Sequence, residues 1–70
     1  MLEQLRKIRC EKDYTCAQMA KVLGVTKATY SKKERGQIIF TLNEAQKIAL
    51  LFGNTIEYIF FGKNVSESDT

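Results

Sequence analysis

The sequence contains no histidine and no tryptophan, and it has only two cysteines. Most metal sites and most pairs of a nucleophile with its base are built from histidine and cysteine, so few routes to either remain. We therefore expect no enzymatic activity, no metal ion and no other cofactor. Cys10 and Cys16 are interpreted as inert reduced thiols, which are typical of the cytosol, and a redox switch is the alternative.

Long apolar runs are also absent, because no segment approaches the roughly 20 apolar residues that a membrane-spanning helix needs. The first residues are amphipathic, whereas a secretory signal places a basic stretch before an apolar block. From these absences we expect a cytoplasmic protein with no membrane partner.

A chain of 70 residues leaves room for one domain, since chains of this size bury only about 60% of the surface that they expose when unfolded. Its 44% hydrophobic and 27% charged residues are typical of a globular protein that folds by itself. We predict one folded domain over residues 1–62 and a flexible polar tail over residues 63–70.

Positive charge is concentrated in the first half of the chain, although the net charge is only +3. Residues 1–37 contain nine of the eleven Lys and Arg residues and four of the eight acidic residues, which gives this part a charge of +5. The remainder carries −2. Such an asymmetry is typical of a protein of which one half binds a polyanion.

Capping signals divide the chain into short segments with apolar residues at helical spacing. Threonine precedes four of these segments, and two of the threonines have Gln or Glu three residues later, which is the spacing of a capping box. A glycine follows each of the same four segments. The predicted helices span residues 2–12, 16–23, 27–35, 42–52 and 56–61.

These segments predict an all-α fold, a compact bundle of five short helices. The absence of proline and of an alternating strand pattern agrees with this prediction. The only β-prone run, Ile38 to Phe40, is too short and too isolated to form a sheet. Tyr30 is expected to fill the core with its hydroxyl group at the rim.

Residues 15–36 have the pattern of a helix, a tight glycine turn and a short polar helix. In a helix-turn-helix, this arrangement places the second helix in the major groove of DNA. The stretch TCAQMAKVLGVTKATYSKKERG resembles the Cro and phage-repressor class of helix-turn-helix regulators, also called the XRE class. The resemblance covers about residues 5–60 and implies a lambda-repressor-like DNA-binding fold with double-stranded DNA as the partner. Its most specific parts are Ala20, Leu23-Gly24-Val25, Thr29 to Ser31 and Glu34-Arg35-Gly36.

The predicted helix over residues 27–35 is expected to read the bases. Lys27, Ala28 and Lys32 lie near its exposed face, where a long donor reaches a guanine edge and a methyl group touches thymine. The resemblance implies base contacts at the same three positions, and in some members at Thr29 or Ser31. Our candidates for base reading are Lys27, Ala28, Lys32 and Thr29.

Phosphate contacts are expected near helix N-termini, where unpaired N–H groups and the helix dipole attract anions. At Cys16 the resemblance implies a phosphate-binding Gln; because a thiol is a poor donor, this contact is either weakened or passed to Gln18. At Lys33 the resemblance implies an apolar residue, so we expect the Lys33 stem to cover the core and its ammonium to reach the DNA backbone. The candidates for phosphate contacts are Thr15, Cys16, Gln18, Thr26, Ser31, Lys33, Arg35 and Gln37.

Arg9 and Glu34 match the positions at which the resemblance implies an ion pair between the first helix and the end of the third. A planar guanidinium–carboxylate pair orients the reading helix and also stabilises the fold.

The aromatic stretch over residues 58–61 carries more apolar surface than one face of a short helix hides. We expect Ile59 and Phe60 to close the core and the remaining apolar surface to form a homodimer interface, with local packing as the alternative. Ile38, Ile39 and Phe40 either extend this interface or lie against the DNA backbone. The candidates for dimerisation are Tyr58, Phe61, Leu51 and Phe40.

Together these patterns predict a sequence-specific, double-stranded DNA-binding regulator of transcription. We expect a phage-like repressor that binds a palindromic operator as a homodimer. A restriction-modification controller, an antitoxin-type regulator or a regulator with a protein partner fits the same residues. An alternative from a different class is a protein-interaction module that uses the aromatic C-terminal surface.

Overall fold

The computed structural model of the chain describes residues 2–62, and the tail expected over residues 63–70 lies outside them. No strand occurs in the described residues, so the predicted all-α fold is confirmed. The helices of this part are α1 (Glu3–Glu11), α2 (Cys16–Leu23), α3 (Lys27–Glu34), α4 (Leu42–Phe52) and α5 (Ile56–Phe61).

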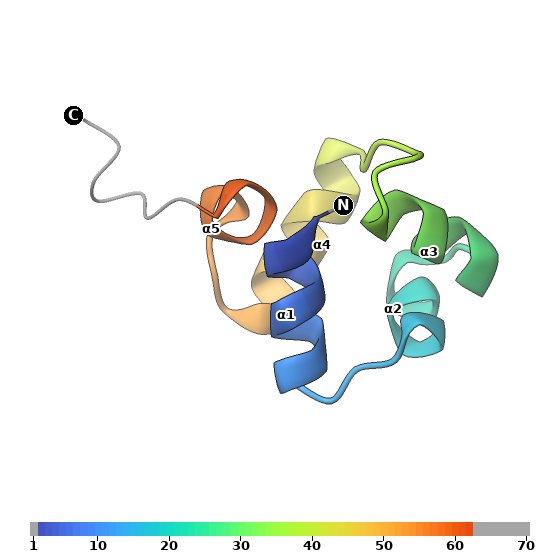
Figure 1. Cartoon of the computed structure of the whole chain (residues 1–70), viewed down its shortest axis with the longest axis horizontal. Helices are drawn as coiled ribbons and strands as arrows, with labels where there is room; N and C mark the ends of the chain where they lie inside the picture. The colour runs from blue at the N-terminus through green and yellow to red at the C-terminus, as the bar shows by residue number, and fades with distance from the viewer. Residues whose placement is uncertain (1, 63–70) are drawn as a thin grey trace.

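Helices α1 and α4 lie in the middle of the molecule, with α2 and α3 on one side of them and α5 on the other (Figure 1). On one side α2 and α3 pack closely against each other, and on the other side α5 packs against both α1 and α4. This arrangement places α3 at an edge of the molecule, on the side opposite α5 (Figure 1).

Local hydrogen bonds explain where four of the helices begin. At the start of α2, α3, α4 and α5, a threonine hydroxyl accepts a bond from the backbone N–H three residues later. At α2 and α4 the side chain of Gln18 or Glu44 in return accepts a bond from the threonine N–H, so both predicted capping boxes are present. These bonds satisfy donors that the start of a helix otherwise leaves unpaired.

The turn between α2 and α3 depends on the backbone conformation of Gly24. Its φ angle is 74°, in the left-handed region, and its N–H donates to the carbonyl of Lys21. A Cβ atom placed on Gly24 meets no atom within 4 Å, so glycine is required by conformation and not by lack of space. The next helix, α3, ends at Glu34, one residue before its predicted end, with Arg35 as the C-cap.

The core contains apolar side chains from all five helices. Tyr30 belongs to it, but the prediction that its hydroxyl group lies at the rim was wrong. The residue is fully buried, and its hydroxyl donates to Oε1 of Glu34 at 2.8 Å. A buried hydroxyl is costly without a partner, and Glu34, one turn along α3, supplies it. The largest fully buried side chains are Leu5, Met19, Tyr30, Ile48 and Ile59.

Within residues 2–62, no helix combines the length and the apolar character needed to cross a membrane. This part of the chain also has no group of three or more His, Cys, Asp or Glu side chains arranged to hold a metal ion.

Candidate nucleic-acid interface

The α2–α3 unit has the geometry of a helix-turn-helix. Gly24 and Val25 form the turn, and the N–H of Val25 donates to the carbonyl of Ala20 at 2.9 Å. Ala20 is buried between the packed helices, where a small side chain permits a close approach. The turn therefore holds α3 at a fixed angle to α2.

One side of α3 is exposed and the other is buried. Lys27, Ala28 and Lys32, the predicted base readers, are all exposed. Tyr30, Lys33 and Glu34 are buried and lie together on the inner face of α3. Two cationic side chains and a methyl group of α3 are therefore exposed to solvent, and α3 itself lies at an edge of the molecule (Figure 1).

Thr29, the fourth candidate for base reading, has a different environment. It is half-buried, and its hydroxyl oxygen accepts a 2.9 Å hydrogen bond from the hydroxyl of Thr26. Its backbone N–H donates to the same Thr26 hydroxyl oxygen, which caps α3. Both threonines therefore take part in the start of α3.

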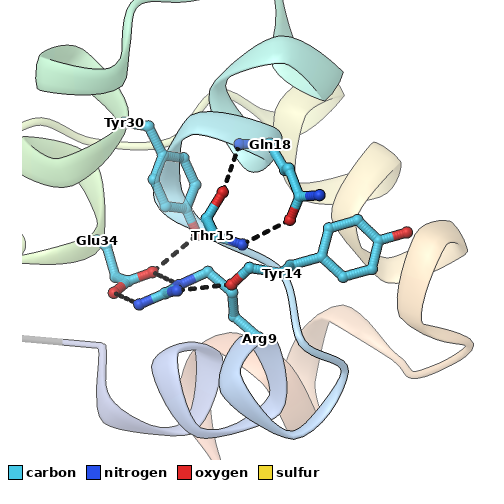
Figure 2. A network of polar contacts seen from close by, with 6 residues as sticks. All are labelled: Arg9, Tyr14, Thr15, Gln18, Tyr30 and Glu34. Carbon is cyan, nitrogen blue, oxygen red and sulfur yellow. Dashed lines mark hydrogen bonds and ion pairs between the residues drawn. The ribbon is translucent and has the colours of Figure 1, made fainter.

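A buried polar network supports the inner side of α3 (Figure 2). The guanidinium of Arg9 donates from Nε to Oε1 of Glu34 at 2.8 Å and from Nη2 to Oε2 at 3.1 Å. A third bond runs from Nη1 of Arg9 to the carbonyl of Tyr14 at 2.8 Å. The structure therefore contains the ion pair that we expect between α1 and the end of α3.

Two groups of this network, Arg9 and Tyr30, have raised pKa values. The hydrogen bond with Glu34 raises the pKa of the Arg9 guanidinium above its ordinary value. Burial, together with the hydrogen bond to Glu34, raises the pKa of the Tyr30 hydroxyl. Arg9 therefore stays charged and Tyr30 remains a hydrogen-bond donor at neutral pH.

The candidates for phosphate contacts around α2 differ in exposure. Thr15 and Gln18 are exposed and form the capping box, with bonds of 2.8 Å and 3.1 Å between them (Figure 2). This capping uses the oxygen of the Gln18 amide and not its N–H groups, which are the donors that a phosphate requires. Cys16 is half-buried and packs against the core.

The candidates for phosphate contacts near α3 also differ in exposure. Thr26, Arg35 and Gln37 are exposed, whereas Ser31 is half-buried. The N–H of Gln37 donates to the carbonyl of Lys32 at 2.9 Å, so Gln37 is hydrogen-bonded to the last turn of α3.

The prediction that the ammonium of Lys33 reaches the DNA backbone was wrong. Lys33 is only 6% exposed, and its Nζ donates to Oε1 of Glu44 at 3.0 Å and to the carbonyl of Ile39 at 3.1 Å. The partial burial of Glu44 favours its neutral form, but hydrogen bonds from Thr41 and Lys33 outweigh this effect and lower its pKa. The charge of Lys33 is therefore satisfied inside the protein, because a buried ammonium requires a partner.

The candidates for dimerisation are apolar side chains outside the α2–α3 unit. Phe61 is 68% exposed, and Leu51 and Tyr58 are more than one-third exposed. Phe40 is half-buried and makes edge-to-face contacts with Tyr30 and Phe60.

Phe40 and Phe61 also line an apolar groove of about 460 Å³ between the α3–α4 segment, α4 and α5. Its rim includes Ile39 and Leu42, which are largely exposed. Ile39 is one of the residues expected either to extend the dimer interface or to lie against the DNA backbone, whereas Leu42 was not a candidate for either role. The run of apolar residues at 38–40 was the available signal for Ile39. No such signal existed for Leu42, which has the spacing of an inward-facing residue.

A helix-turn-helix family model matches residues 5–59 of the chain. The match includes the complete α2–α3 unit and both residues of the Arg9–Glu34 pair. No curated protein and no solved structure matches the chain.

Proposed function

The chain belongs to the XRE class of helix-turn-helix DNA-binding transcriptional regulators, and we propose that it is a repressor that binds a palindromic operator as a homodimer. The observation that supports this proposal best is the division of α3 into an exposed cationic side and a buried side paired with α1. A helix supported in this way presents its exposed side chains to the major groove in a defined orientation.

In this proposal α3 reads the bases. Lys27 and Lys32 donate to guanine O6 and N7, the methyl group of Ala28 contacts a thymine methyl, and Thr29 contributes at the start of the helix. Because lysine is a flexible point charge, these residues favour guanine-containing sites without defining one sequence.

The phosphate contacts of the proposal come from both helices of the unit. Thr15, Gln18 and Cys16 lie at the start of α2, where the dipole and N–H groups favour an anion. The remaining phosphate candidates, which lie at the start of α3 or beside its exposed side, are Thr26, Ser31, Arg35 and Gln37.

A homodimer explains the exposed apolar side chains. Tyr58, Phe61 and Leu51 contribute apolar area on α5 and α4, and Phe40 contributes from the segment before α4, where it also packs against Tyr30 of α3. Two copies related by a two-fold axis read two half-sites about one helical turn of DNA apart, which makes the operator palindromic.

Selection from a randomised duplex library tests the proposal. We expect the wild-type protein to enrich a palindromic sequence at physiological salt. A Lys27→Ala/Lys32→Ala double variant should lose the sequence preference, because each good base contact contributes about 1 to 3 kcal/mol of discrimination.

The apolar groove favours a second candidate, a protein-interaction module on the same fold. Salt dependence separates the two candidates, because log K for DNA falls by about 0.9 per neutralised phosphate for each tenfold rise in salt. An apolar protein interface hardly responds to salt. If neither protein in the selection enriched any duplex, the interaction module would replace the repressor proposal.

A further inference from the structure

Lys33, which is buried, and Glu44, which is half-buried, form an ion pair that connects three parts of the chain. Lys33 lies in the last turn of α3, Glu44 lies in the first turn of α4, and the carbonyl of Ile39 belongs to the segment between them. The side chains of Lys33 and Glu44 are 8% and 15% exposed. The ammonium also lies 5.7 Å from the centre of the Phe40 ring.

The pair holds the far end of the segment that joins α3 to α4. Oε1 of Glu44 accepts bonds from Nζ of Lys33 and from the N–H of Thr41, both at 3.0 Å. At the near end of the segment, the N–H groups of Gly36 and Gln37 donate to carbonyls of the last turn of α3. Both ends of the segment are therefore hydrogen-bonded to α3 or α4.

Stability alone does not explain a charge at this position. An apolar side chain of similar length would fill the space of Lys33 without the cost of removing an ammonium from water. A buried ion pair contributes little net stability, but it requires one geometry of its partners. The groups whose geometry this pair restricts are α3, α4 and the backbone between them.

Gln37 is an exposed polar residue in the segment whose far end this pair holds. Its N–H is bonded to the carbonyl of Lys32, so its side chain leaves the backbone within one turn of a proposed base reader. A displacement of the segment that breaks this bond moves Gln37 relative to α3 without altering the exposed side of the helix itself.

We propose that Lys33 and Glu44 are positioning residues for DNA binding, which hold the α3–α4 segment so that Gln37 meets a phosphate of the operator. This inference rests on the proposed function. It assigns to Lys33 an indirect role, through Glu44 and the backbone at Ile39, and not a contact with DNA.

The substitution Glu44→Gln tests the proposal because a pure charge effect and a loss of positioning change the affinity for DNA in opposite directions. Glutamine keeps the size of the side chain and the oxygen that caps α4. Removal of a negative charge by itself strengthens binding to a polyanion. Loss of positioning instead weakens binding to the selected operator duplex by about tenfold, the effect of one hydrogen bond to a charged group. Glu57→Gln, which removes an exposed acid on α5, is the matched control and should not weaken binding.

A double-mutant cycle with Gln37→Ala gives the decisive measurement. In the wild-type background we expect Gln37→Ala to weaken binding by about tenfold. In the Glu44→Gln and Lys33→Met backgrounds it should have almost no further effect, because the contact is already lost. All titrations are done well below the unfolding midpoint of each variant, and Lys33→Met replaces Glu44→Gln if the latter does not fold.

Additive effects would overturn the proposal, since a purely structural role of the pair leaves the contribution of Gln37 unchanged. A Gln37→Ala substitution without effect in the wild-type background would overturn it as well. If the wild-type protein selects no duplex, the proposed function itself fails, and this outcome is distinct from a wild-type protein that binds while the cycle is additive.

Discussion

The side chains of α3 separate into those that end in solvent and those that pair inside the protein. Lys27 and Lys32 are exposed, whereas Lys33 and Glu34 are buried and bonded to other helices. Every buried side-chain nitrogen or oxygen within residues 2–62 has a hydrogen-bond partner. Exposure therefore distinguishes the side chains that are able to reach DNA from those that orient the helix.

We predict that Arg9→Ala lowers both the stability of the fold and the affinity for the operator. The substitution leaves the carboxylate of Glu34 buried without its cation, and loss of one partner of a buried pair costs about 3 to 5 kcal/mol. Thermal unfolding followed by circular dichroism measures the first effect, and a binding titration below the unfolding midpoint measures the second.

Two variants control this prediction. Arg6→Ala removes an exposed arginine from the same helix and should change stability by less than about 0.5 kcal/mol. Arg9→Lys keeps the charge but loses the two-bond geometry, so its effect should be intermediate. An Arg9→Ala variant that melts at the wild-type temperature would show that the pair does not support the fold.

The starts of four helices depend on interactions between residues that are close in the sequence. The turn between α2 and α3 places the strictest requirement on the backbone conformation. Four threonine caps start α2, α3, α4 and α5, and each cap involves residues only three positions apart. The turn contains only Gly24 and Val25, because Thr26 already caps α3. The orientation of α3 therefore depends on a left-handed conformation at one residue.

We predict that Gly24→Ala destabilises the protein by about 1 to 2 kcal/mol, the cost of the left-handed conformation for a residue with a Cβ atom. The surrounding space is open, so steric overlap adds nothing to this cost. Gly24→Asn should cost less, since asparagine adopts this conformation more readily. Chemical denaturation measures the free energy of unfolding of the wild-type protein and of both variants. Equal losses of stability for Gly24→Ala and Gly24→Asn would indicate a steric cause instead.

Two different surfaces lie on opposite sides of the folded chain. The cationic side of α3 is at one edge, and α5, which carries the exposed Phe61, is at the other (Figure 1). This separation allows one copy to contact DNA and another protein surface at the same time. A dimer on two half-sites requires an interface that leaves both copies of α3 free to face the same DNA.

We predict that Phe61→Glu converts a dimer into a monomer, because a charge in the centre of an apolar interface is costly to bury. Analytical ultracentrifugation measures the change in mass. The same variant should bind a full palindrome much more weakly, while binding to an isolated half-site stays close to that of the wild type.

Leu50→Glu is the matched control, since Leu50 is exposed on α4 but does not line the apolar groove. We expect it to keep the wild-type mass. A wild-type protein that sediments as a monomer at micromolar concentration and binds the palindrome without cooperativity would contradict the prediction.

The sequence by itself determined the helices and the family. Capping boxes, glycine ends and apolar spacing are interactions between residues three or four positions apart, so they are visible in the chain before it folds. The predicted boundaries of α2, α4 and α5 agree with the structure, and α3 differs by one residue. The pattern from Thr15 to Gly36 was sufficient to indicate the helix-turn-helix that the family model matches.

The tertiary structure decided which polar groups are buried. Lys33 and Glu44 are eleven positions apart on different helices, and no local pattern indicates that a lysine in a basic stretch turns inward. The hydroxyl of Tyr30 is buried for the same reason, since its environment is assembled from several helices. Side-chain pairing between elements depends on how the elements pack, and packing is a property of the folded chain and not of any short segment.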